Sequence, residues 1–165
     1  MKNILKNFLV TGLLFGILFG AFIWIVTDLY TAIVAGAISG VLFGAVMGAF
    51  TIFMSLKYRG KGSEVTGNPN IFMEGPANHF VGKESVGGWL YLTDRELYFK
   101  SHSINVHTHI LILPLEKIEV AMKTKIYGIV PTGLMIITTE GKIERFVAYD
   151  RKKWVQKIEE GVSGM

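Results

Sequence analysis

The chain has 165 residues, half of them hydrophobic, with a formal net charge of +4 and no cysteine. Without cysteine it can form no disulfide, thiolate nucleophile or cysteine-based zinc site, which fits a reducing compartment. Positive and negative side chains are mixed after residue 56. This mixture is unlike the dense basic stripe of a nucleic-acid-binding surface, so we expect no nucleic-acid partner.

Two long apolar runs occupy the first third of the chain, and Asp28 is the only charged residue between positions 8 and 56. A bilayer core of about 30 Å needs roughly 20 apolar helical residues. We therefore predict a transmembrane helical hairpin over residues 1–56, with spans at about 8–27 and 31–54.

Basic residues flank both runs, with Lys2 and Lys6 before the first and three more after the second: Lys57, Arg59 and Lys61. By the positive-inside rule, both termini of this multi-pass membrane protein are expected to be cytoplasmic. The three later residues could also contact anionic lipid. A cleaved signal peptide is the alternative for the first run. That run is long for a signal sequence, no A-x-A-like site follows, and a second run begins almost at once.

Glycine recurs at every fourth position in both runs, which predicts helix packing: Gly12, Gly16, Gly20, Gly36, Gly40, Gly44 and Gly48. Glycine is unfavourable inside helices in water, whereas in lipid it permits close helix contact. The pattern fits packing of the two spans against each other. The second series is longer, so part of it could also serve a homo-oligomer.

After the second run the composition changes. Residues 57–76 are rich in Gly, Ser, Asn, Pro and charge, which predicts a linker. From 77 to 161 we predict one mainly-β domain, because β-branched and aromatic residues alternate between turn signals. Seven antiparallel strands are expected, at 77–84, 87–93, 96–102, 107–113, 116–123, 132–139 and 142–149.

A C-terminal amphipathic helix follows, capped by Asp150 and ending near Gly161, with Trp154 and Ile158 on its apolar side. Two-residue alternation assigns one face of the strands to the core. The residues on this face are Leu90, Leu92, Leu97, Phe99, Ile110, Ile112, Ile118, Val120, Leu134, Ile136, Phe146 and Ala148.

Three stretches carry a family resemblance. GGWLYLTDRELYF, which begins at Gly87, resembles the signature of the GRAM branch of the pleckstrin-homology (PH) superfold. ILILPLEKIEVAM, from Ile110, resembles its next hydrophobic strand, and GLMIITTEGKIERFVAYDRKKWVQKI, from Gly133, resembles its closing hairpin and helix. The resemblance covers about residues 76–160. It implies a seven-stranded, partly closed antiparallel barrel capped by a C-terminal helix.

Pleckstrin-like modules commonly bind anionic lipid headgroups through basic loops, and this is what the resemblance implies here. The candidate residues in the domain are Lys123, Lys125, Lys152 and Lys153. A solvated surface is the simpler interpretation of any one of them. The sequence lacks the compact basic pattern of a strong phosphoinositide reader.

Histidines give a weak metal hypothesis. His107 and His109 stand two apart on an expected strand, near His102, but no carboxylate is close in sequence. His79 is expected at the surface. No nucleophile elbow or carboxylate dyad is found, so we expect neither an enzyme nor a cofactor. The sequence predicts a membrane-anchored binding or adaptor protein for lipid or a protein partner. The alternative is a glycine-zipper hairpin that oligomerises, with a regulatory β domain.

Overall fold

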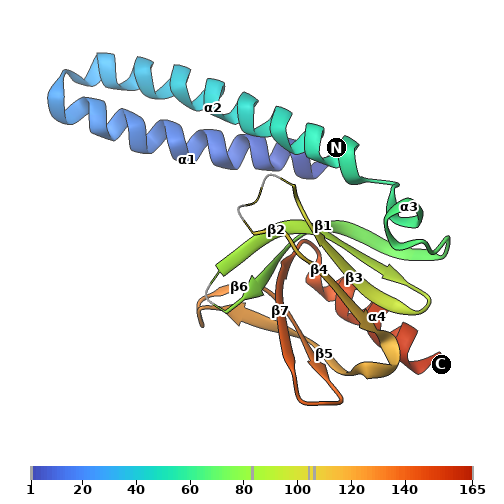
Figure 1. Ribbon diagram of the computed structural model, residues 1–165. Helices are drawn as coiled ribbons and strands as arrows, with labels where there is room; N and C mark the ends of the chain where they lie inside the picture. Colours follow the sequence, from blue (N-terminus) through green and yellow to red (C-terminus); the bar gives the residue numbers. More distant parts are fainter. Residues whose placement is uncertain (1, 83, 104, 106, 165) are drawn as a thin grey trace. The chain divides into compact units, whose positions relative to one another are not determined.

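The computed structural model describes residues 2–82, 84–103, 105 and 107–164. The chain divides into two compact units, residues 1–57 and residues 58–165. Each unit has its own internal packing. The first unit is helical and the second is built around a β-sheet (Figure 1).

The first unit is an antiparallel helical hairpin of α1 (Lys2–Val26) and α2 (Leu29–Tyr58), whose last residue lies in the second unit. Asp28 precedes α2 and caps its first turn, because its carboxylate accepts hydrogen bonds from the Thr31 backbone N–H at 3.0 Å and the Thr31 hydroxyl at 2.7 Å. Both helices are long and apolar enough to cross a membrane. α1 begins before its expected span of 8–27 and ends at Val26, whereas α2 extends past its expected span of 31–54 at both ends.

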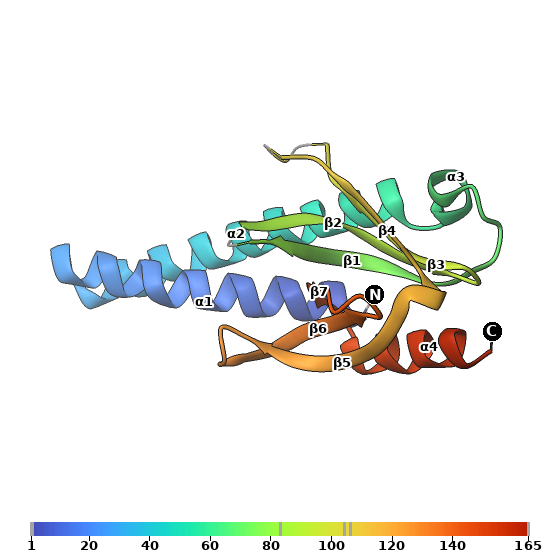
Figure 2. The ribbon, with the colours of Figure 1, turned by 60° about the horizontal axis from the view of Figure 1, so that its bottom comes forward.

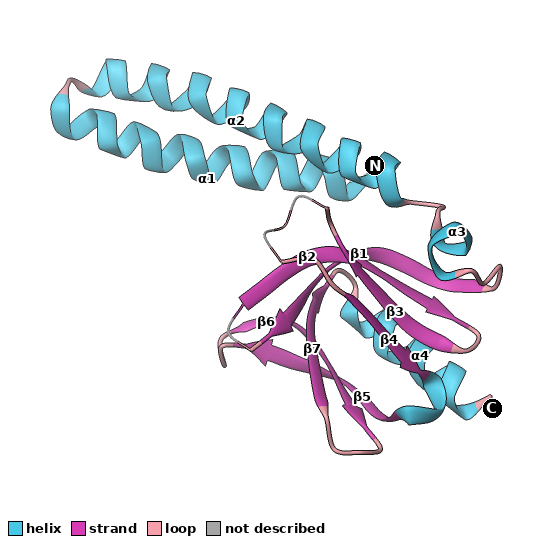
Figure 3. Cartoon of the chain, in the orientation of Figure 1, coloured by secondary structure: helices cyan, strands magenta, loops and turns pink. Residues whose placement is uncertain are grey.

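The described residues of the second unit form one short helix, seven strands, a 3-10 turn and a final helix (Figure 3). In chain order these are α3 (Gly62–Thr66), β1 (Ile71–Val81), β2 (Glu84–Thr93), β3 (Glu96–Ser101), β4 (Ile110–Pro114), η1 (Leu115–Lys117), β5 (Ile118–Ile126), β6 (Val130–Thr138), β7 (Ile143–Ala148) and α4 (Arg151–Ser163).

All neighbouring strands pair antiparallel, in the order β4-β3-β2-β1-β7-β6-β5. The sheet is a half-barrel, and α4 packs on its open side with Trp154 and Ile158 buried in the main core (Figure 2). The prediction of seven antiparallel strands and a C-terminal helix is confirmed. Because this core and every strand lie within residues 58–165, the second unit can fold as an independent domain.

The expected core is correct for most strands and wrong in β4. Ile110 and Ile112 are about half exposed, whereas Leu111 and Leu113 pack inward. Leu111 pairs with Phe99 and Leu113 with Leu97, so the inner face of β3 sets the inner face of β4. A shift of one residue exchanges the two faces of a strand.

A similar correction applies in β5, where the ladder is irregular between Ile118 and Val120. Ile118 and Ala121 are buried, while Val120 is only partly buried. An extra residue in a strand reverses the inward alternation beyond it. The expected inward position of Val120 is therefore taken by Ala121.

Residues 57–76 do not form the expected linker. They include α3 and the first residues of β1. This segment covers the outer face of the sheet, where Tyr58 and Val65 pack on a second core cluster of Trp89, Tyr91 and Tyr98. Polar residues alternate with the apolar ones in this segment, so the sequence shows no helix or strand pattern there. Its apolar side chains find their partners only on strands far along the chain.

The start of α4 also differs from expectation. Asp150 has a left-handed backbone conformation and makes no side-chain cap. Instead, its carbonyl oxygen accepts hydrogen bonds from the backbone N–H groups of Lys153 and Trp154. The helix continues to Ser163, beyond the predicted end at Gly161.

Candidate functional surfaces

The hairpin packs glycine against backbone. A Cβ atom added to Gly16 would lie 2.6 Å from the carbonyl oxygen of Gly36, and one added to Gly12 would lie 2.7 Å from that of Gly40. The corresponding distance from Gly20 to the Ala32 oxygen is 3.1 Å. Real Cβ atoms essentially never lie within 3.0 Å of such an atom, so the two helices contact each other at Gly12 and Gly16 at a distance that requires glycine.

The longer series on α2 has little surface to spare. Gly36, Gly40 and Gly44 all face the α1 backbone, and an added Cβ on Gly44 would lie 2.8 Å from the carbonyl oxygen of Phe8. Only Gly48 meets side-chain atoms alone, at 3.7 Å from Phe8. The stripe expected to leave room for a second copy is therefore largely consumed inside the hairpin.

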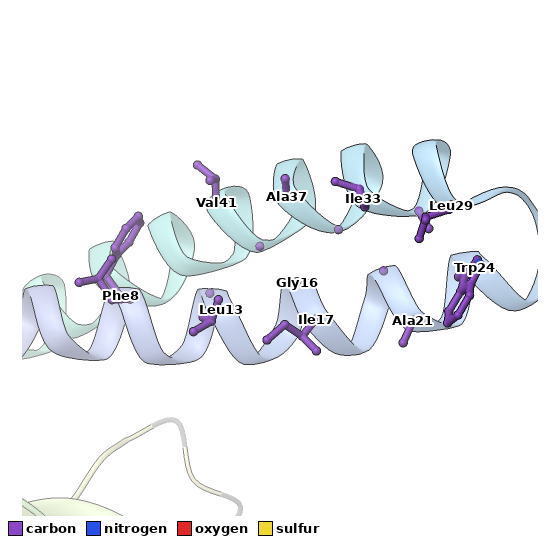
Figure 4. A pocket seen from close by; sticks show the side chains of 16 residues that line it. Phe8, Leu13, Gly16, Ile17, Ala21, Trp24, Leu29, Ile33, Ala37 and Val41 are labelled. Carbon is purple, nitrogen blue, oxygen red and sulfur yellow. The ribbon is translucent and has the colours of Figure 1, made fainter.

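One flank of the hairpin is a groove between the helices (Figure 4). Its lining comes from both helices and is almost wholly apolar, including Phe8, Ile17, Trp24 and Ile33. Such a flank matches the hydrocarbon of a bilayer.

The basic residues expected at a lipid site lie in two groups within the domain. Lys123 and Lys125 are exposed on β5, on either side of Thr124. Lys152 and Lys153 are exposed at the start of α4, directly after Arg151. The structure brings these groups to one region.

A hydrogen bond makes this connection. The Arg151 guanidinium Nη1 donates to the carbonyl oxygen of Thr124 at 2.6 Å, which ties the first turn of α4 to β5. We call the region defined by Lys123, Lys125, Lys152 and Lys153 the basic corner. Within the described part of the chain, no ion pair involves any of these four lysines. Arg59 and Lys61 are exposed near the start of the domain, while Lys57 belongs to the helical unit.

The β5–β6 hairpin is longer than expected. β5 continues to Ile126 and β6 begins at Val130, so only three residues form the turn. Tyr127 and Gly128 both have positive φ, at 51° and 73°. The Ile129 N–H donates to the Ile126 carbonyl at 3.2 Å, closing the turn. The Tyr-Gly pair is the sequence signal for this reversal.

A buried polar chain lies inside the half-barrel and involves a residue that the sequence placed at the surface. His79 is only 4% exposed. Its Nδ1 lies 2.8 Å from His109 Nε2, and its Nε2 lies 2.8 Å from Glu144 Oε2. The other carboxylate oxygen pairs with Lys142 at 2.6 Å. His79 shares the inward face with Ala77, two residues earlier, and that parity could have identified it.

The contacts within the buried polar chain shift the pKa values of its side chains. Hydrogen bonding from His79, together with Lys142, holds the pKa of the Glu144 carboxyl below its usual value despite burial. Burial and the neighbouring His79 lower the pKa of His109. The Glu144 carboxylate accepts the hydrogen bond from His79 Nε2, and the tautomer of His79 that donates there leaves its Nδ1 to accept from His109 Nε2.

The three histidines of the metal hypothesis are separated. His107 is exposed and pairs with Glu84 at 3.1 Å, His109 turns inward to His79, and the His102 ring packs on Tyr58. These positions lie before β4, which begins at Ile110 and not at the expected residue 107. Among the described residues, no group of three potential ligands is arranged to hold a metal ion.

Several solved structures are similar to this chain at low sequence identity. A structure described as the C-terminal domain of an unknown protein from Leishmania infantum shares 13% identity at a TM-score of 0.51, covering 66% of this chain and 97% of its own. A pleckstrin homology domain shares 19% identity at a TM-score of 0.47, covering 58% and 88%. The Slm1 PH domain in complex with phosphoserine shares 14% identity at a TM-score of 0.44, covering 56% and 96%.

No curated protein matches the chain. A family model for the GRAM domain matches residues 77–160, which span β1 from Ala77, the rest of the half-barrel and most of α4. The resemblance read from the three sequence stretches is thereby confirmed. This chain belongs to the GRAM domain family.

Proposed function

We propose that this protein is a membrane-anchored, non-enzymatic binding protein whose GRAM domain binds anionic lipid headgroups at the cytoplasmic membrane surface. GRAM and pleckstrin-like domains are in general non-catalytic modules that bind phosphoinositides or proteins at membranes. The basic corner is the observation that carries the lipid assignment. Its four lysines are exposed and unpaired among the described residues.

Membrane anchoring is supported by the apolar hairpin. Its helices have the length and composition of transmembrane spans. The glycine contacts leave the large apolar side chains pointing outward, where lipid can cover them. Charge asymmetry then favours cytoplasmic termini, because the residues flanking the spans are basic.

Anchoring changes what a weak lipid site can achieve. A domain tethered to a membrane samples headgroups at a high effective concentration. Each lysine close to an anionic surface contributes about 1 kcal/mol. Several such contacts suffice to orient a tethered domain without a deep headgroup pocket.

The binding test uses residues 58–165, whose folding is checked first by circular dichroism. Co-sedimentation is measured with vesicles containing phosphatidylserine and with neutral phosphatidylcholine vesicles. We expect binding to the anionic vesicles, and a loss of roughly tenfold or more when Lys152 and Lys153 are both changed to alanine.

The matched control replaces Lys117 and Lys157, which are already paired with Glu140 at 3.0 Å and Glu160 at 2.6 Å. Alanine at these two positions removes the same formal charge and should change the binding much less. Equal partitioning on neutral and anionic vesicles would contradict the lipid assignment and favour a protein partner. The oligomerising-hairpin alternative is disfavoured because the glycine series is occupied within the hairpin.

A further inference from the structure

The most exposed apolar side chains of the GRAM domain gather at the end of the β5–β6 hairpin. Tyr127 is 78% exposed and Ile129 is 80% exposed, and Val130 beside them is also exposed. Exposure of bulky apolar residues to water at a hairpin tip is unfavourable, and covering them with a partner lowers the free energy. The partner must suit a narrow protruding tip.

A second hairpin end extends this tip. The Phe80 ring, near the end of β1, meets the Tyr127 ring edge-on with centroids 6.1 Å apart. The next residue, Val81, is exposed. The ends of the β1–β2 and β5–β6 hairpins lie at the same end of the domain (Figures 1 and 2). We call Val81, Tyr127, Ile129 and Val130 the apolar tip.

The turn holds the apolar tip in a fixed shape. Tyr127 adopts a left-handed conformation, which is uncommon for an aromatic residue and costs free energy. Gly128 and the Ile126–Ile129 hydrogen bond complete a tight reversal. Little conformational entropy is lost when such a preformed turn binds, and its Tyr127 and Ile129 side chains are already exposed.

Charge identifies the partner. Lys125 lies on β5, two residues before Tyr127 of the turn, and Lys123 lies two residues earlier on the same strand. The other lysines of the basic corner are joined to this strand through Arg151 and Thr124. Apolar and aromatic residues beside lysines match the boundary between acyl chains and anionic headgroups, where tyrosine is also favoured.

We propose that the apolar tip inserts into the headgroup–acyl boundary of an anionic bilayer while the basic corner contacts the headgroups. This inference rests on the proposed lipid binding and adds to it a defined depth and orientation of the domain. The β5–β6 hairpin enters the membrane surface, and β4, on the opposite edge of the sheet, stays in water.

The test uses the full chain, which has no cysteine and so accepts a single probe. Ile129→Cys is labelled with the environment-sensitive fluorophore NBD, and Ser163→Cys, exposed at the end of α4, is the control site. Both proteins are reconstituted in vesicles with or without phosphatidylserine, and NBD quenching by lipids carrying spin labels in their acyl chains is measured. We expect quenching at 129 in anionic vesicles, little at 163, and loss of the signal at 129 when Lys123 and Lys125 are changed to alanine.

A second measurement separates insertion from headgroup attraction. In residues 58–165, Ile129→Ser should weaken binding to anionic vesicles about tenfold. Ile112→Ser, a matched change of an exposed isoleucine on β4, should have little effect. If Lys152 and Lys153 matter for binding but the probe at 129 stays in water, insertion is overturned and the proposed function stands.

If the domain binds neither vesicle and the probe stays in water, both proposals fail. A probe at 129 that is shielded from water, escapes acyl-chain quenchers and responds to the protein-to-lipid ratio would place the tip against a second copy of the chain. That result also overturns insertion.

Discussion

The helical hairpin and the GRAM domain differ in the size of the side chains that form their packed contact surfaces. In the hairpin the contact surface is made by missing side chains, since Gly16 and Gly36 bring backbone against backbone while large apolar residues face outward. In the domain the contact surface is made by large side chains, such as Phe146 and Trp154, which are fully buried. Under the proposed membrane anchoring, the comparison teaches that the solvent around each unit, lipid or water, decides which surface carries the stability.

The domain should therefore suffer most from loss of volume. Trp154→Ala is expected to destabilise residues 58–165 by about 3–5 kcal/mol, because the indole is buried between α4 and the sheet. Urea denaturation measures this loss. Lys153→Ala, next to it on the outer surface of the same helix, should stay within about 0.5 kcal/mol. A tolerated Trp154→Ala would mean that α4 is not part of the folded core.

The hairpin should suffer most from added volume. In Gly36→Ala the new Cβ would lie 2.7 Å from the Gly16 oxygen and 3.1 Å from the Gly20 Cα, so the helices must separate, at a cost of about 1–3 kcal/mol. Cysteines at positions 15 and 43, whose phenylalanine rings stack at 4.3 Å, report helix proximity through a short thiol cross-linker.

The same cross-linking measured in Gly48→Ala is the control, because that Cβ has ordinary contact distances. We expect reduced cross-linking in Gly36→Ala and normal cross-linking in Gly48→Ala. Equal yields in both variants would show that the close glycine contact does not hold the hairpin together.

The buried polar chain gives the domain a pH dependence that the apolar hairpin core lacks. The folded state lowers the pKa of His109 from 6.5 and of Glu144 from 4.5. In the acid range the unfolded chain then binds more protons, so stability is complete above about pH 6.5 and falls as the pH falls. The charged groups next to the buried polar chain are Lys142, which pairs with Glu144, and Glu84, which acts on His109.

Melting temperatures of residues 58–165 between pH 8 and pH 5 measure this effect. We expect a decrease toward acid pH, with a smaller decrease in His109→Asn, which cannot take up the proton. His107→Asn is the control, since its ring is exposed. A melting temperature that stays constant down to pH 5 would contradict the assigned charge states.

The smallest effect is expected from separating the units. Removal of residues 1–57 should leave the melting temperature of the domain nearly unchanged, because its core and all seven strands lie after this segment. The comparison is made with the full chain in detergent. A large drop in melting temperature would mean that the hairpin contributes to the stability of the domain and that the two units are not independently stable.

Strong patterns made most of the fold predictable. Repeated two-residue alternation and turn residues identified seven strands. The four-residue glycine spacing predicts close helix packing, and an added Cβ on most of these glycines would meet the backbone of the other helix. In β4, however, Ile110, Leu111, Ile112 and Leu113 are all apolar, so alternation cannot choose the inner face. That choice depends on pairing with β3.

The functional surfaces were less predictable than the fold. The sequence predicts each lysine of the basic corner as a candidate, and their grouping depends on the Arg151–Thr124 hydrogen bond between distant segments. In the sequence His79 looks like an ordinary polar residue. Its buried partners are Glu144 on β7 and His109 just before β4, which are distant in the sequence. Long-range pairing of strands, which no local window contains, creates both features.

The order of strands leaves β4 and β5 as the two free edges of the sheet. Unpaired edges invite joining with a second sheet, a hazard that grows when many copies share one membrane plane. β4 is short and ends in Pro114, while β5 carries two register irregularities and exposed lysines. These features oppose edge-to-edge aggregation, so the lysines of β5 protect solubility in addition to the role proposed for them at a lipid surface.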